Sequence, residues 1–293
     1  MGAEPGPGAA VPPAGGVTGN GRELGGSFML GPWRVRRAGY GAMQLAGDGV
    51  FGPPRDRGEA LRVLLAAAAA GVNHIDTAQF YGAGTVNELI REALYPYPDG
   101  LAIVSKVGAR RDAGGALLRS WEARELRQGI EDNLRALGAG RLAAVNLRMM
   151  DPSQAPGRRF DAQLAVLAQA REEGLIDGIG LSNISRAHLL RAVAQTEIVC
   201  VQNLFNLADQ RSLDVLVECQ ARNIAFVPFC PLGARLGATP VQVALAWLLD
   251  LAPNVLLIPG TRTRAHLADN LASADVELDD DTRAELARQF PAI

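Results

Sequence analysis

The chain has no marked excess of charge of either sign. Its 293 residues contain 29 Lys and Arg against 31 Asp and Glu, which gives a formal net charge of −2 with neutral histidines. Proteins that bind nucleic acid usually carry a basic stripe or patch, because their cations must face phosphates. The sequence shows no such excess, so we expect no nucleic-acid partner.

Long apolar runs are also missing. A membrane-spanning helix needs roughly 18 or more consecutive apolar residues. The longest simple apolar tract, residues 64–70, is far shorter and comes soon after the charged Arg62. A secretory signal begins with basic residues and continues with an apolar core, and the first residues of this chain follow neither rule. We therefore expect no membrane partner and no secretory signal.

Cysteine is scarce. The three cysteines are Cys200, Cys219 and Cys230, and their spacing matches no metal-binding motif. Three thiols cannot all pair, so we expect no disulfide scaffold and a reducing compartment. The sequence thus predicts no metal site and a cytoplasmic location.

Apolar and small residues are abundant. Hydrophobic residues make up 48% of the chain and charged residues 20%, which is enough for a large buried core. Glycine, proline and alanine dominate residues 1–27, and this composition predicts a disordered tail. Residues 28–293 are expected to form one domain that opens with a small hairpin at residues 28–35, around the Gly31-Pro32 break.

Eight apolar strands alternate with eight helices in this domain. The strands are predicted at residues 38–41, 72–75, 101–105, 142–147, 178–181, 198–201, 224–227 and 255–258. The helices are predicted at residues 57–70, 85–94, 122–137, 161–173, 186–194, 210–222, 240–251 and 263–272. Strands that are apolar on both faces belong to a parallel sheet covered by helices. The pattern predicts an α/β fold, a single (β/α)8 TIM barrel, with an extra C-terminal helix at residues 280–290 outside it.

Polar and glycine residues gather where the predicted strands end. In such barrels the carboxyl ends of the strands form one rim, and active sites lie there. In strand order, the residues at these ends are Gly41, Ala42 and Met43; Asp76 and Tyr81; Lys106; Arg148; Ser182 and Asn183; Gln202 and Asn203; Phe229, Cys230, Pro231, Leu232 and Gly233; and Pro259, Gly260 and Thr261. Their collection at one rim predicts a functional site.

Asp76 and Lys106 end buried strands, where a charge must be paired or lose its proton. Taken alone, the pair fits a structural ion pair and a catalytic pair about equally. Tyr81 changes this balance, because a lysine beside a tyrosine lowers the pKa of the phenol and makes it a usable proton donor. The three residues together predict carbonyl reduction.

Ordered motifs along the chain resemble the aldo-keto reductase family from about Phe28 to the C-terminus. They are Asp76-Thr77-Ala78 with Tyr81-Gly82, then Lys106, Gly180-Leu181-Ser182-Asn183, Val201-Gln202-Asn203, Pro231-Leu232-Gly233 and Ile258-Pro259-Gly260-Thr261. Residues 39–46, 51–57 and 145–148 resemble in particular the bacterial, pyridoxal reductase-like branch of that family.

This resemblance implies an NADP-dependent oxidoreductase that reduces a small aldehyde or ketone to an alcohol, with pyridoxal as a candidate substrate. It implies that Tyr81 is the proton donor, that Lys106 lowers its pKa, and that Asp76 holds Lys106. It further implies that NADPH is bound by Gly41, Ala42, Met43, Ser182, Asn183, Gln202, Phe229, Leu232, Gly260, Thr261, Arg262, Arg264, His266 and Asn270. Arg262 and Arg264 are the cations expected to meet a 2′-phosphate, which favours NADP over NAD.

The chain departs from the family pattern at two places. Arg148 stands where the family usually has a catalytic histidine. Arginine cannot release a proton near neutral pH, but it can stabilise a developing alkoxide, so we expect it to favour substrates with an anionic group. The alternative for Arg148 is a salt bridge to Asp151. After Gly233 the chain reaches Pro240 quickly, which shortens a segment that often covers the cofactor.

These departures keep two other functions open, a cofactor-binding regulatory protein and a non-redox lyase or isomerase on the same fold. The sequence predicts a monomer or weak homo-oligomer. His74, which lies on the same strand face as Asp76, is expected to be a packed interior residue.

Overall fold

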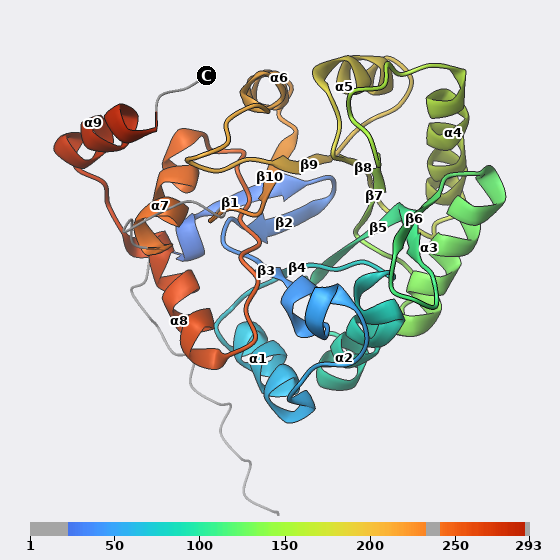
Figure 1. Ribbon diagram of the computed structural model, residues 1–293, viewed down its shortest axis with the longest axis horizontal. Coiled ribbons are helices and arrows are strands. Elements are labelled where there is room, and N and C mark those ends of the chain that lie inside the picture. Colours follow the sequence, from blue (N-terminus) through green and yellow to red (C-terminus); the bar gives the residue numbers. More distant parts are fainter. Residues whose placement is uncertain (1–22, 233–240, 291–293) are drawn as a thin grey trace, which may run out of the picture.

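The computed structural model describes residues 23–232 and 241–290. These residues form a parallel barrel surrounded by helices, as predicted (Figure 1). The main sheet has eight strands, of which seven follow the order β10-β9-β8-β7-β5-β4-β3 and β6 pairs with β5. Its strands are β3 (Tyr40–Gly41), β4 (His74–Asp76), β5 (Ala102–Arg111), β6 (Leu117–Ser120), β7 (Ala144–Arg148), β8 (Ile179–Ser182), β9 (Cys200–Leu204) and β10 (Ala225–Phe229).

Eight helices form a ring around these strands, with bounds within three residues of the predicted ones. They are α1 (Arg57–Ala69), α2 (Thr85–Leu94), α3 (Ala123–Leu137), α4 (Arg158–Glu172), α5 (Arg186–Val193), α6 (Leu213–Ala221), α7 (Val241–Leu251) and α8 (Arg264–Ala272). The predicted extra helix is α9 (Asp280–Gln289), which lies outside the ring and buries Leu286. Short 3-10 turns are η1 (Glu23–Gly25), η2 (Ala42–Leu45), η3 (Asp48–Val50), η4 (Tyr81–Gly84) and η5 (Ser273–Asp275).

The predicted hairpin is also present, as β1 (Ser27–Leu30) and β2 (Trp33–Arg36). Leu30 and Val35 are fully buried and pack with Ala102 and Ala225, the first residues of β5 and β10. The hairpin therefore plugs the amino-terminal end of the barrel and leaves the carboxyl end free for a site. Residues 1–22 lie outside the described residues, so the disordered tail stays a prediction.

The barrel closes differently from the prediction. The expected strand at residues 255–258 makes only isolated bridges, from Val255 to Phe226 and from Leu257 to Ala38. Prolines flank this segment at positions 253 and 259, and because proline lacks an N–H it limits the length of a ladder. Backbone bonds still join both sides, from Leu256 N to Phe226 O at 2.8 Å and from Gly39 N to Leu257 O at 2.8 Å.

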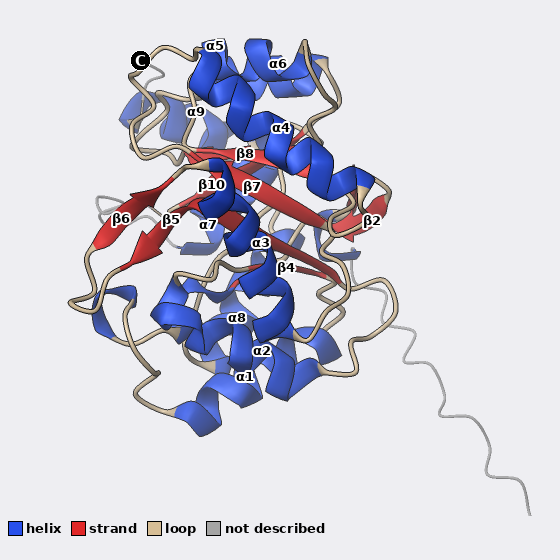
Figure 2. Cartoon of the chain, turned by 90° about the vertical axis from the view of Figure 1, so that its right-hand side faces the viewer, coloured by secondary structure: helices blue, strands red, loops and turns tan. Residues whose placement is uncertain are grey.

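A second hairpin was not predicted. The strand expected at residues 101–105 continues to Arg111 as β5, turns, and pairs antiparallel with β6 (Figure 2). The turn is fixed by Asp112, whose Oδ1 accepts hydrogen bonds from Gly114 N and Ala116 N, and by Gly115 at φ +86°. An Asp followed by glycines is a turn signal, so the sequence does contain a trace of this hairpin.

Two negative findings bear on function. Among residues 23–232 and 241–290, no helix has the length and apolar character needed to cross a bilayer. Over the same residues, no group of three or more His, Cys, Asp or Glu side chains is arranged to hold a metal ion.

Candidate active site

Parallel pairing brings the predicted polar residues to one end of the barrel. Lys106 is in register with Asn146, Arg148 with Ser182, and Ser182 with Gln202. Asp76 is the last residue of β4, and its neighbour in β5 is Val104. Asp76, Lys106 and Gln202 thus meet inside the barrel near its carboxyl end, where they are 2%, 4% and 2% exposed.

Lys106 and Gln202 both donate hydrogen bonds to the carboxylate of Asp76. Lys106 Nζ donates to Asp76 Oδ1, and also to the backbone oxygen of Thr77 at 2.9 Å. Gln202 Nε2 donates to Asp76 Oδ2 at 2.8 Å. Burial is the largest single influence and would lower the pKa of Lys106, but the charges of Asp76 and Tyr81 and the hydrogen bonds to both together outweigh it, so the pKa is raised. Lys106 is therefore held as an ammonium ion.

Tyr81 lies against this ammonium. It begins η4, a turn in which Gly82 and Ala83 both have positive φ, and its ring packs edge-on against Phe80. Lys106 Nζ is 5.0 Å from the centre of the Tyr81 ring. The sequence predicted that Lys106 would make this phenol acidic, and the net effect is the opposite. Burial raises the pKa of Tyr81 more than Lys106 lowers it, so the pKa lies above its ordinary value.

Arg148 ends β7 and is half-buried on the same side of the site. Its Nη1 donates to Met149 O at 3.1 Å, and its charge acts to lower the pKa of Tyr81. The salt bridge to Asp151 that was the alternative is absent from the described part of the chain. Asp151 instead accepts hydrogen bonds from Ser153 and Gln154.

A cavity of about 720 Å³ opens at this end of the barrel, within the range of small-ligand sites. Asp76, Tyr81 and Gln202 contribute its polar wall. The predicted cofactor residues that line it are Gly41, Met43, Phe229, Leu232 and Gly260. Cys230, Pro231, Ile258 and Pro259, which belong to the predicted rim or to the motifs quoted above, line it as well. Sequence reasoning missed the other lining residues, namely Gln44, Leu204, Asn206, Ala208 and Asp209.

The two glycines of this cavity also have a structural reason. A Cβ on Gly41 would lie 2.3 Å from Ile258 O, and one on Gly260 would lie 2.8 Å from Gly41 O. Both glycines are thus required where the first strand meets the closing segment.

Other predicted cofactor residues lie beside the cavity and do not line it. Ala42 and Ser182 are buried, and Asn183, with φ +55°, donates from Nδ2 to Met149 O at 2.7 Å. Thr261 accepts a hydrogen bond from the Tyr40 hydroxyl through its backbone oxygen at 2.8 Å.

The remaining members of the predicted set belong to α8 and the segment before it. Thr263 caps this helix by accepting the N–H of His266, which is exposed, whereas Asn270 is buried. Arg262 Nε donates to Gln44 O at 2.9 Å. Arg264 donates from its backbone N and from Nε to Glu59 Oε1. The short segment after Gly233 lies outside the described residues.

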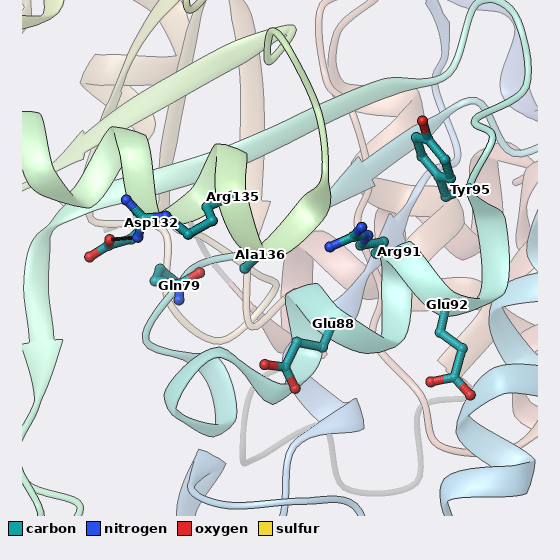
Figure 3. Close-up of a pocket in the computed structure, with 8 residues that line it drawn as sticks. All are labelled: Gln79, Glu88, Arg91, Glu92, Tyr95, Asp132, Arg135 and Ala136. Carbon is teal, nitrogen blue, oxygen red and sulfur yellow. Dashed lines mark hydrogen bonds and ion pairs between the residues drawn. The ribbon is translucent and has the colours of Figure 1, made fainter.

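A second hollow, of about 690 Å³, lies on the outside of the barrel between α2 and α3 (Figure 3). Its wall is polar and charged, and Arg135 forms an ion pair with Asp132 there. It contains none of the predicted site residues. The residues that line it are Gln79, Glu88, Arg91, Glu92, Tyr95, Asp132, Arg135 and Ala136.

The arrangement at the barrel mouth defines a class of protein. A buried, charge-paired lysine lies next to a protonated phenol, and the phenol is on the wall of a ligand-sized cavity. A phenol placed in this way can donate a proton to a bound carbonyl, which is the chemistry of barrel oxidoreductases for carbonyl and alcohol groups.

Comparison with known proteins gives the family. The family described as "Aldo/keto reductase family" matches residues 37–236 and 232–288. A pyridoxine 4-dehydrogenase of Escherichia coli is 49% identical over 277 residues, which cover 89% of this chain and 96% of that protein. An uncharacterized oxidoreductase of Schizosaccharomyces pombe is 34% identical over 276 residues, which cover 89% of each. The chain belongs to the aldo/keto reductase family.

Solved structures agree on the fold. A thermostable aldo-keto reductase in complex with the inhibitor epalrestat has a TM-score of 0.74 at 27% identity, covering 89% of this chain and 98% of that one. An aldo/keto reductase of Klebsiella pneumoniae, in complex with NADP and acetate, has a TM-score of 0.72 at 24% identity, covering 89% of this chain and 93% of that one.

Proposed function

We propose that this protein interconverts an aldehyde and its alcohol with NADP(H), and that pyridoxal is reduced to pyridoxine. The observation that carries the proposal is the buried Lys106–Asp76 pair beside Tyr81 on the wall of the cavity. The similarity to a pyridoxine 4-dehydrogenase supports the choice of substrate.

The cavity suits a nicotinamide dinucleotide. Phe229, Leu232 and Met43 offer apolar surface for a flat ring, and Gln202 offers an amide beside it. The exposed Arg262 and Arg264 at the start of α8 provide cations and a helix N-terminus for phosphate, which favours NADP over NAD. When bound, NADPH supplies the hydride that reduces the carbonyl carbon.

Tyr81 gives the proton to the carbonyl oxygen. Its raised pKa keeps the hydroxyl protonated at neutral pH, so the donor form is the dominant form. The positive charges of Lys106 and Arg148 stabilise the phenolate that remains after transfer. Arg148 in addition offers a two-pronged donor to an anionic oxygen of the substrate, such as the phenolate of pyridoxal.

The test follows absorbance of the reduced nicotinamide while protein, NADPH and pyridoxal are mixed. We expect turnover, and expect Tyr81→Phe to lower kcat by about 10²- to 10⁴-fold. Tyr97→Phe is the matched control, because it removes a phenol hydroxyl that bonds Leu137 O away from the cavity. NADPH binding without oxidation would support a regulatory protein, and product without NADPH would support a lyase or isomerase.

The assembly and location are proposed together with this function. We propose a monomer or weak homo-oligomer in the cytoplasm, which sedimentation across a concentration series and cell fractionation would test.

A further inference from the structure

A buried polar network lies behind the Lys106–Asp76 pair, on the side away from the cavity. Thr77 Oγ1 donates to Asn87 Oδ1 at 2.7 Å, and Asn87 Nδ2 donates to Asn133 Oδ1 at 2.9 Å and to Gln79 Oε1 at 2.7 Å. Ser105 Oγ donates to the same Asn133 oxygen at 2.5 Å. The network joins Thr77, which follows β4, and Ser105, which lies within β5, to helices α2 and α3.

Both asparagines are fully satisfied. Asn133 Nδ2 donates to Gly129 O at 2.8 Å and to Lys106 O at 3.5 Å, so every amide group of Asn87 and Asn133 has a partner. The two side chains are 0% exposed. Buried amides are costly unless completely bonded, and a complete network holds its members in one arrangement. Asparagine also weakens a helix interior, so helix propensity does not explain why Asn87 and Asn133 stand at these two positions.

The network touches the site through the two residues next to the ion pair. Thr77 follows Asp76, and its backbone oxygen accepts a hydrogen bond from Lys106 Nζ at 2.9 Å. Ser105 precedes Lys106 in β5. Asn87 therefore fixes the residue whose carbonyl orients the ammonium, and Asn133 fixes the backbone from which the lysine side chain extends.

We propose that Asn87 and Asn133 are positioning residues for carbonyl reduction, acting through Thr77 and Ser105 to hold the Lys106 ammonium against Asp76 and Tyr81. This inference rests on the proposed function for its kinetic consequences. A lysine side chain has many rotamers, so a fixed ammonium needs both its carboxylate and its carbonyl acceptor in place.

The experiment compares Thr77→Val with Thr77→Ser. Valine keeps the shape of threonine and the backbone carbonyl but removes the hydroxyl that bonds Asn87, whereas serine keeps that hydroxyl. We expect kcat for pyridoxal to fall about tenfold in Thr77→Val, with KM for NADPH within about twofold, and to stay near wild type in Thr77→Ser. Asn87→Leu should give the same kinetic loss, and its combination with Thr77→Val should add little.

The pH profile separates positioning from a merely structural role. With Lys106 displaced, the ammonium lowers the pKa of Tyr81 less, so the alkaline limb of kcat/KM moves to higher pH in Thr77→Val. Tyr97→Phe, which loses one hydrogen bond between the loop after α2 and the last residue of α3, should leave the limb in place. Equal kcat and equal limbs in Thr77→Val and wild type would overturn the proposal.

A readout without turnover is available because Lys106 is the only lysine in the chain. In protein labelled with ¹⁵N-lysine, the side-chain ammonium gives one signal whose shift and proton exchange report its hydrogen bonds. We expect a moved, faster-exchanging signal in Thr77→Val and a wild-type signal in Thr77→Ser. If pyridoxal is not reduced, this result still supports or refutes the positioning role while the proposed function fails. Identical signals in all three proteins would refute it.

Discussion

Each end of the barrel holds a cation, and the two cations, the buried Lys106 and the half-buried Arg37, have different kinds of partner. At the open end, Lys106 is paired with the carboxylate of Asp76 next to a titratable phenol. At the plugged end, Arg37 donates, within the described part of the chain, only to backbone oxygens: from Nη2 to Leu249 and Ala252 at 2.5 and 2.7 Å, from Nη1 to Gly25 at 3.2 Å and from Nε to Val255 at 3.1 Å.

The partners show what each cation does. Carbonyl oxygens do not titrate at ordinary pH. Arg37 therefore connects η1, the end of α7 and the closing segment at residues 255–258 through hydrogen bonds that do not depend on pH. The Asp76 carboxylate balances the Lys106 charge and leaves the ammonium beside a group that gains and loses a proton. We infer that the plugged end carries stability and the open end carries chemistry.

The largest effect is expected at the open end. Lys106→Met leaves the buried Asp76 charge without its partner, which costs about 3–5 kcal/mol of unfolding free energy. It also removes the cation that stabilises the Tyr81 phenolate, so kcat should fall by about 10²-fold or more. Asp76→Asn with Lys106→Met should recover most of the stability and none of the activity. Recovered activity in the double variant would contradict the separation of roles.

The matching change at the plugged end is Arg37→Met. Hydrogen bonds from a charged group contribute more than neutral ones, and four carbonyl oxygens lose their donor, so we expect a loss of about 2–3 kcal/mol in urea unfolding. Turnover measured at low denaturant should stay within about twofold of wild type. A large drop in kcat without unfolding would show that the hydrogen bonds of Arg37 also influence the active site.

The sequence correctly predicted the location of those side chains that stand near the carboxyl ends of parallel strands. Asp76, Lys106 and Gln202 follow from the rule that parallel strands share a carboxyl edge, because each lies at or near such an end. The barrel and α9 follow from the periodicity of apolar residues, and the hairpin follows from the Gly31-Pro32 break between two short strand-like segments.

The features that the sequence did not predict depend on how distant segments pack against each other. The pKa direction of Tyr81 is set by burial that no local pattern reveals. Asn87 and Asn133 look in sequence like exposed helix residues, and only the packing of α2 and α3 against the sheet shows that they are buried. The acceptors of Arg37 come from segments more than 200 residues away and from residue 25, so its role is invisible to spacing.

The barrel interior between the two ends offers an intermediate test through His74. This side chain is 1% exposed, as predicted, and its Nδ1 has no hydrogen-bond partner among the described residues. Burial lowers its pKa to about 4, with the nearby Asp76 opposing the shift. The folded protein therefore keeps His74 neutral while the unfolded chain binds a proton below about pH 6.5.

Stability contributed in this way is complete above about pH 6.5 and is lost as the pH falls toward 4, by about 3 kcal/mol in total. His74→Gln should remove that part of the slope in denaturant unfolding measured from pH 7 to pH 4. An unchanged slope would mean that the carboxylates account for the whole acid dependence.

The smallest effect concerns Arg148, a residue of the open end whose charge has no carboxylate partner in an ion pair among the described residues. If its guanidinium binds an anionic oxygen of the substrate, Arg148→Met should lower kcat/KM for pyridoxal by about tenfold, equivalent to about 1.4 kcal/mol. The loss for a neutral aldehyde such as benzaldehyde should be clearly smaller, because only the shared alkoxide then meets the cation. Arg148→Lys keeps the charge but not the two-pronged geometry, so it should recover part of the pyridoxal activity. Equal losses for both aldehydes would assign Arg148 to the reaction itself and remove it from substrate choice.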